Sequence, residues 1–118
     1  MNGLAGMDKA GRLRESVAFD APNGTADAFG GTSESFSNGN PVSAQMIYQK
    51  GDEAVQSARL AGRQVFKIKV RSSSTTRAVT TDHRMRDVRR GDVYNILEVD
   101  KITDRAWVWM QVEGPQSA

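Results

Sequence analysis

The fold is decided by residues 62–113, which read GRQVFKIKVRSSSTTRAVTTDHRMRDVRRGDVYNILEVDKITDRAWVWMQVE. Three segments of this stretch alternate apolar and polar residues with a period of two, which indicates strands that bury one face. The apolar residues that share a face are Phe66, Ile68 and Val70 in the first segment and Val108, Met110 and Val112 in the last, with Val93–Val99 as the segment between them. The chain is therefore predicted to be mainly β: a small antiparallel β-barrel or sandwich with one short helix and long loops.

Two further strands are predicted before this stretch. The first is Glu15–Asp20, in which Val17 and Phe19 share a face, and the second is Ser43–Gln49. The residues between them, Asn23–Pro41, are mostly Gly, Ser, Asn and Thr. Such a composition is typical of a long loop.

The one short helix is predicted at Ala54–Leu60, with Asp52 as its N-cap and Gly62 as its stop signal. A helix of about two turns is marginal in water by itself. We therefore expect its small side chains to dock on another surface. The polar run Ser72–Arg77 is predicted to be an exposed loop, and Lys101–Arg105 the loop of the last hairpin.

The length of 118 residues fits one domain with one core. We place a flexible leader at residues 1–10, the β-barrel domain at 11–114 and a short tail at 115–118. The hydrophobic share of 38% is low for a compact globule, which favours a subunit that buries surface against neighbours. No run approaches the ~18 apolar residues of a membrane span, so no membrane contact is expected.

Positive charge is concentrated in the middle of the chain. Residues 50–90 carry eleven Lys and Arg against four Asp and Glu, while the segments on either side are net acidic. One interpretation is that these cations are the solvated face of a strand beside acidic neighbours. The other is a basic surface that faces polyphosphate or an acidic protein ring.

The sequence offers little material for catalysis. The chain has no cysteine, which excludes disulfides, thiolate zinc sites and cysteine nucleophiles. Its one histidine, His83, lies between Asp82 and Arg84 in a polar stretch, where a surface or loop-packing role is expected. Phosphate-loop, serine-hydrolase and zinc-protease motifs are also missing from the sequence. We predict neither an enzyme nor a cofactor or metal site.

The two tryptophans, Trp107 and Trp109, lie on the face of the last strand opposite its aliphatic residues. Three interpretations remain open for them. They could pack against the short helix or the long loop, form a subunit interface, or stack bases beside the cations of the strand that ends at Arg71.

Several weak elements occur in a specific order over nearly the whole chain. They are Gly11-Arg12-Leu13-Arg14 before a strand, a Gly-rich loop, Ala44, Gly51-x-Glu53, a strand ending in Arg71, Arg84, Tyr94-x-Ile96, and Val99 before a last hairpin. In this order and spacing the chain resembles the head-tail joining proteins of tailed bacteriophages, also called head-closure or stopper proteins, and their gene transfer agent homologues.

The resemblance implies a structural connector subunit of a phage or gene transfer agent particle. It implies a homo-oligomeric ring of six or twelve copies, with the portal or adaptor ring protein above and a tail terminator or tail-tube protein below. Such a ring retains packaged double-stranded DNA by non-specific contact and provides the tail attachment surface. It is a virion component assembled in the host cytoplasm.

By position, the resemblance puts the segment Lys50–Arg63 near the channel or the tail interface. The candidate interaction residues, at the channel or at the ring interface, are Lys50, Glu53, Arg59, Arg63, Lys67, Lys69, Arg71, Trp107 and Trp109. The alternative function is a free single-stranded nucleic-acid-binding β-barrel, which would use the last five of these residues.

Overall fold

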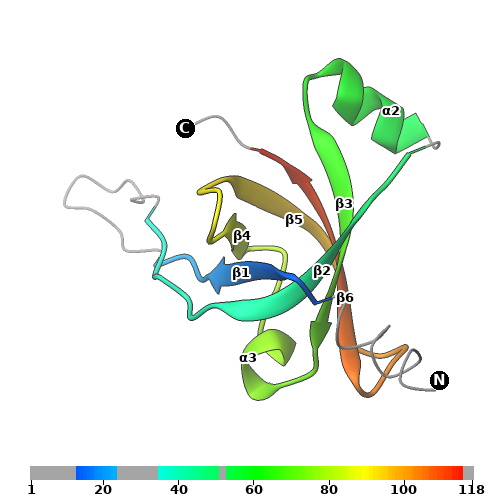
Figure 1. Ribbon diagram of the computed structural model, residues 1–118. Coiled ribbons are helices and arrows are strands. Elements are labelled where there is room, and N and C mark those ends of the chain that lie inside the picture. The colour runs from blue at the N-terminus through cyan, green and yellow to red at the C-terminus, as the bar shows by residue number, and fades with distance from the viewer. Residues whose placement is uncertain (1–12, 24–34, 51–52, 116–118) are drawn as a thin grey trace.

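Six strands of the chain close into an antiparallel barrel in the order β1-β2-β3-β6-β5-β4 (Figure 1). The structure is a computed structural model that describes residues 13–23, 35–50 and 53–115. Its elements are β1 (Glu15–Asp20), β2 (Val42–Tyr48), α2 (Glu53–Leu60), β3 (Gln64–Arg71), α3 (Ser74–Arg77), β4 (Arg84–Asp87), β5 (Val93–Asp100) and β6 (Trp107–Gly114). The predicted mainly β fold is confirmed, and the barrel is the form that it takes.

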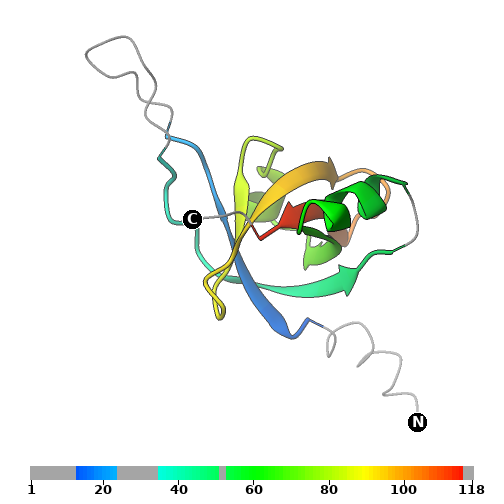
Figure 2. The same ribbon diagram turned by 90° about the horizontal axis from the view of Figure 1, so that it is seen from above.

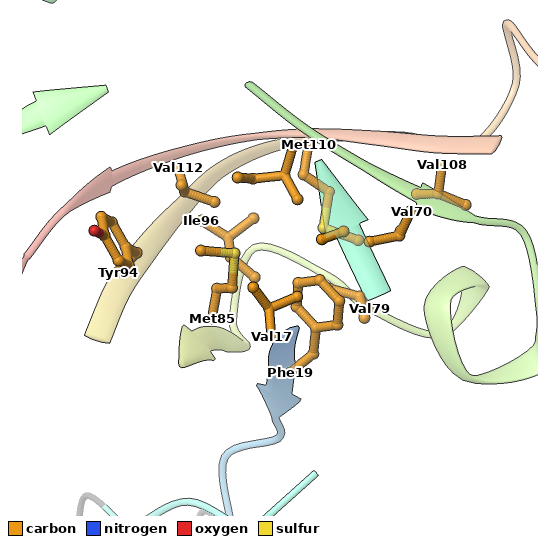
Figure 3. Packing of buried hydrophobic residues seen from close by; sticks show 12 residues of the cluster. Val17, Phe19, Val70, Val79, Met85, Tyr94, Ile96, Val108, Met110 and Val112 are labelled. Atoms are coloured by element: carbon orange, nitrogen blue, oxygen red, sulfur yellow. The ribbon is translucent and has the colours of Figure 1, made fainter. Parts of the chain in front are cut away.

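The barrel interior is filled by the alternating apolar residues of all six strands (Figure 3). The buried cluster comprises Val17, Phe19, Ala44, Ile68, Val70, Val79, Met85, Tyr94, Ile96, Val108, Met110 and Val112. Because side chains on a strand point alternately to its two faces, the residues between these positions are directed to the outer wall of the barrel. The outer residues are therefore the ones available for function.

Strand β6 lies between β3 and β5 and pairs with both. The outward-facing side chains of β3 and β5 therefore lie next to those of β6. It pairs with β3 over eight residues, from Gln64 opposite Gly114 to Arg71 opposite Trp107. Its pairing with β5 contains a shift in register between Ile96 and Glu98. The irregularity gives β5 an extra residue at this point, which is a β-bulge.

The prediction of an exposed loop at Ser72–Arg77 is wrong in one respect, because Ser74–Arg77 form the short helix α3. The Ser73 hydroxyl accepts a hydrogen bond from the Thr76 N–H at 3.1 Å, and the Ser73 N–H donates to the Thr76 Oγ1 at 2.9 Å. The buried Thr76 hydroxyl also donates to the Arg71 carbonyl at 2.7 Å. The hydroxyl groups that suggested a solvated loop are thus used to cap a helical turn.

The long predicted loop is partly paired in the structure. Beyond β1, the Asn23 N–H donates to the Ser35 carbonyl at 2.9 Å and the Ser37 N–H to the Ala21 carbonyl at 2.8 Å. Pro22 and Phe36 form an antiparallel bridge between these bonds. Residues 21–23 and 35–37 therefore form a narrow two-stranded ribbon, which we call the arm, and it extends away from the barrel (Figures 1 and 2).

Helix α2 confirms the predicted short helix and forms part of the connection between β2 and β3 (Figure 1). The proposed N-cap, Asp52, lies outside the described residues. At the other end, the Gly62 N–H donates to the Arg59 carbonyl at 3.0 Å and the Arg63 N–H to the Ala58 carbonyl at 2.8 Å. With Gly62 at a φ of 82°, this is a Schellman motif.

Replacing Gly62 by alanine is expected to lower the free energy of unfolding by about 1 kcal/mol, because a side chain disfavours this positive φ. Open space surrounds the position, so backbone strain alone would cause the loss. Urea denaturation measures it. Ser57→Ala, at an exposed position of the same helix, is the control and is expected to change stability by less than about 0.5 kcal/mol. Equal stability of Gly62→Ala and the wild type would contradict this account.

The predicted domain limits of 11–114 remain a prediction, because residues 1–12 and 116–118 lie outside the described ranges. Among the described residues, no helix is long and apolar enough to cross a membrane.

Candidate interaction surfaces

Five of the nine candidate residues come together on the outer wall of the barrel. Strand register places Lys69 directly opposite Trp109 and Arg71 opposite Trp107. The Lys69 Nζ lies 4.3 Å from the ring centroid of Trp107 and 5.4 Å from that of Trp109. Lys67 reaches Trp109 at 5.2 Å, and the Arg71 guanidinium reaches Trp107 at 5.0 Å. Cations of β3 therefore alternate with the indoles of β6, and we call this arrangement the cation–indole ladder.

The ladder explains how two tryptophans can lie on the outside of the barrel. Trp107 is only 8% exposed, and the cationic groups that lie over its ring come from β3. Each such contact contributes on the order of 0.5–1 kcal/mol when it is exposed to water. The indoles of β6 and the cations of β3 therefore pack against one another on the outer wall.

A groove of about 360 Å³ adjoins the ladder on the side of β5. It is lined by Gln49, Lys67, Glu98, Asp100, Thr103, Trp109, Met110 and Gln111. Register places Glu98 opposite Gln111 and Asp100 opposite Trp109, so Trp109 separates a basic strand from an acidic one. We call this groove the Trp109 groove.

The Asp100 carboxylate is fixed in position by the loop that follows it. Its Oδ1 accepts hydrogen bonds from the Ile102 N–H and the Thr103 N–H, both at 3.0 Å. Hydrogen bonds from the Thr103 side chain and from these two backbone groups lower the pKa of Asp100. The carboxylate is therefore an oriented negative charge at the edge of the groove. The sequence did not predict that Asp100 lies next to Trp109, because this pairing depends on the strand register beyond the β-bulge.

The remaining candidates belong to α2 and its flanks, apart from the ladder. Lys50 is exposed, the exposed Arg59 lies 6.0 Å from the Tyr48 ring centroid, and Arg63 pairs with Glu113 at 3.2 Å. Glu53 begins the helix, but its side chain is outside the described part of the structure. The sequence therefore selected two surfaces, one on β3 and β6 and one on α2.

A buried carboxylate at the base of the arm was not predicted. Asp20 has no exposed surface, and it accepts hydrogen bonds from Arg84 Nε at 3.0 Å, Arg86 Nε at 3.1 Å and the Gly39 N–H at 2.8 Å. Burial alone would raise the pKa of Asp20, but the bonds from Arg86, Gly39 and Arg84 outweigh it and lower the pKa. Arg84 also lies 4.5 Å from the ring centroid of Phe36. This Asp20 clamp ties the arm to β4.

The described residues hold no group of three or more His, Cys, Asp or Glu side chains that could bind a metal ion. The Nδ1 of His83 accepts a hydrogen bond from the Thr80 N–H at 3.1 Å, within a turn.

A model of the phage head completion protein family matches residues 8–113. The chain belongs to this family. It is a family of structural virion proteins, and this member has a structural role in the phage head and associates with other head or tail proteins. The resemblance to head-closure proteins of phages and gene transfer agents is thereby confirmed.

No curated protein matches the chain. Two solved structures share the fold of this head completion protein. One is a chain in the virion of a native gene transfer agent particle, with a TM-score of 0.62 and 18% identity over 89% of this chain and 96% of that chain. The other is the solution structure of protein SF1141 from Shigella flexneri 2a, with a TM-score of 0.65 and 20% identity over 86% of this chain and 92% of that chain. At these identities the likeness concerns the fold alone.

Proposed function

We propose that this head completion protein is a ring subunit that joins the head to the tail. Copies of the chain, six or twelve in number, form a ring below the portal or adaptor ring protein and above the tail terminator or tail tube. The ring retains packaged DNA and presents the tail attachment surface, and it assembles in the host cytoplasm. The observation that carries this proposal is the cation–indole ladder, an ordered contact surface on the wall of a barrel from this family.

The closed barrel explains why the contacts must come from side chains. A closed sheet has no free strand edge along its wall, so neighbouring copies have no edge there to extend. Tryptophan and arginine are enriched in protein interfaces, where they account for much of the binding energy. The ladder combines both residue types with lysines that are already positioned. Its outward position therefore suits a neighbouring copy or a neighbouring ring.

The same wall suits weak contact with DNA. Lys67, Lys69 and Arg71 project at every second residue of β3, a spacing of about 6.6 Å. Phosphate contacts of this kind do not depend on sequence and weaken as salt rises. The carboxylates of Glu98 and Asp100 on β5, on the far side of β6, limit the attraction. A genome that must leave through the ring requires contacts that are weak and independent of sequence.

The alternative of a free single-stranded DNA binder requires bases to stack on the indoles. Lys69 and Arg71 lie over Trp107, and a base would have to displace them. Single-stranded DNA is therefore expected to leave tryptophan fluorescence unchanged at about 0.15 M salt. Quenching at low DNA concentration would favour the alternative over the connector.

Particles made without the protein test the connector directly. We expect electron microscopy to show heads that lose DNA and lack tails, and addition of the purified chain is expected to restore both. A variant carrying Lys67→Glu, Lys69→Glu and Arg71→Glu is expected to restore at least about tenfold fewer particles, because like charges oppose the contact. Arg77→Glu, at an exposed position of α3, is the matched control. Normal particles in the absence of the protein would refute the proposal.

A further inference from the structure

Helix α2 presents an exposed stripe on its outer face. Gln56, Arg59 and Leu60 lie at the spacing of one helix face, and Leu60 is 91% exposed. Arg63 follows just beyond the end of the helix. Among the side chains that the structure describes, the opposite face buries Val55 and Ala58, against Val65 of β3. A helix of eight residues with so small a buried cluster gains little from its own barrel. We therefore expect contact with another chain to stabilise α2 further.

The chemistry of this stripe specifies its partner. Leu60 suits an apolar contact, and Arg59 next to it suits carboxylates. The guanidinium of Arg63 already bonds to Glu113 at 3.2 Å. Arg59 lies 6.0 Å from the Tyr48 ring centroid but makes no ion pair within the described ranges, so it is the cation that can pair with a carboxylate of a partner. The Schellman motif at Gly62 fixes the end of the helix, and with it the direction of Leu60. The stripe is therefore an ordered apolar and cationic tip.

Strand β5 carries the complementary set of residues. Leu97 stands at the bulge and is 43% exposed, and Glu98 and Asp100 follow it. Glu98 makes no ion pair with any residue in the described ranges. Both carboxylates line the Trp109 groove, whose volume of about 360 Å³ lies in the range of binding clefts. The groove also contains Lys67, so its formal charge is one negative unit in excess.

We propose that the α2 tip of one copy docks on β5 and in the Trp109 groove of the next copy. Arg59 lies between Glu98 and Asp100 on the β5 side of the Trp109 indole, and Leu60 packs on Leu97. Two different patches meet in this contact, so it is head-to-tail, and such a contact forms a ring when the rotation between copies closes. The inference rests on the proposed ring and adds the residues that join its subunits.

Cysteine cross-linking tests the contact in assembled particles, and the chain has no native cysteine to interfere. Leu60→Cys and Glu98→Cys chains are mixed, supplied to heads that lack the protein, and oxidised. We expect covalent dimers that contain one chain of each kind. Ile102→Cys replaces Leu60→Cys in the control, because Ile102 is equally exposed, at 92%, but lies in the β5–β6 loop. That control is expected to give at least about tenfold less dimer with Glu98→Cys.

Charge exchange tests the same contact by a different route. Arg59→Glu alone is expected to reduce the copies bound per particle at least about tenfold, and Glu98→Arg in the same chain is expected to restore them to within about twofold. Particles that contain the protein but give no cross-link between positions 60 and 98, or no rescue by Glu98→Arg, would overturn the docking and leave the connector intact. Absence of the protein from all particles would overturn both.

Discussion

Replacing Asp20 by alanine is expected to lower the free energy of unfolding by about 3 kcal/mol. The substitution leaves Arg84 and Arg86 without their carboxylate and the Gly39 N–H without its acceptor. Removal of one partner from a buried ion pair typically costs about 3–5 kcal/mol. The lower end applies here, because the two arginine side chains remain 32% and 27% exposed to water. Urea denaturation followed by far-UV circular dichroism measures the loss.

The loss is expected to include release of the arm from the barrel. The clamp connects Asp20 of β1 and Arg84 and Arg86 of β4 to Gly39, which follows the ribbon, and Arg84 contacts Phe36. Limited proteolysis is therefore expected to cut Asp20→Ala near residues 35–40 faster than the wild type. Asp82→Ala, at an exposed position, is the control and is expected to behave like the wild type. Equal stability of Asp20→Ala and the wild type would show that the buried carboxylate is not needed.

The pH dependence follows from the same carboxylate. Since folding lowers the pKa of Asp20, its contribution to stability is present above the unfolded pKa of about 3.9 and is lost as pH falls through the folded value. The wild type is thus expected to lose this contribution only below about pH 4. Asp20→Asn, which cannot ionise, is expected to show a shallower fall over the same range. Parallel profiles for the two proteins would contradict the assignment.

Trp107→Ala is expected to destabilise the barrel by about 3 kcal/mol, and Trp109→Ala by about 1–2 kcal/mol. The difference follows from burial, because Trp107 is almost covered and Trp109 is only half-buried. Large-to-small changes at buried aromatic positions cost about 3–5 kcal/mol, and the outer wall can relax more easily than a core. Loss of the cation–indole contacts adds a smaller amount. Thermal and urea denaturation of both variants show which substitution destabilises the barrel more.

Trp107→Phe separates the contribution of an aromatic ring from that of the larger indole. Phenylalanine keeps an aromatic face for Lys69 and Arg71, and we expect it to retain more than half of the stability that alanine loses. If Trp107→Ala and Trp109→Ala lowered the free energy of unfolding equally, the β3 cations would not shield Trp107 from solvent. In that case the ladder would be an open surface, and base stacking would become accessible.

Local patterns in the sequence were sufficient for most of the secondary structure. The alternation in β3, β5 and β6 reflects strands that bury one face, and Gly62 marks the end of α2 because a positive φ favours glycine. Local patterns failed at Ser74–Arg77, where the same hydroxyl groups can be solvated in a loop or can cap a helical turn. Only the buried environment of Thr76 distinguishes the two.

By itself, the sequence determined the mainly β class, the short helix, the basic middle of the chain and the choice of Lys67, Lys69, Arg71, Trp107 and Trp109 as one candidate set. These properties depend on composition and on neighbours along the chain. Only the tertiary structure decided that each β3 cation lies over a β6 indole, that Asp100 lies opposite Trp109, and that Asp20 meets arginines more than sixty residues away. Strand register and barrel closure create those contacts. A shift of one residue would turn every outer side chain inward, and this register is set by the packing of the whole core.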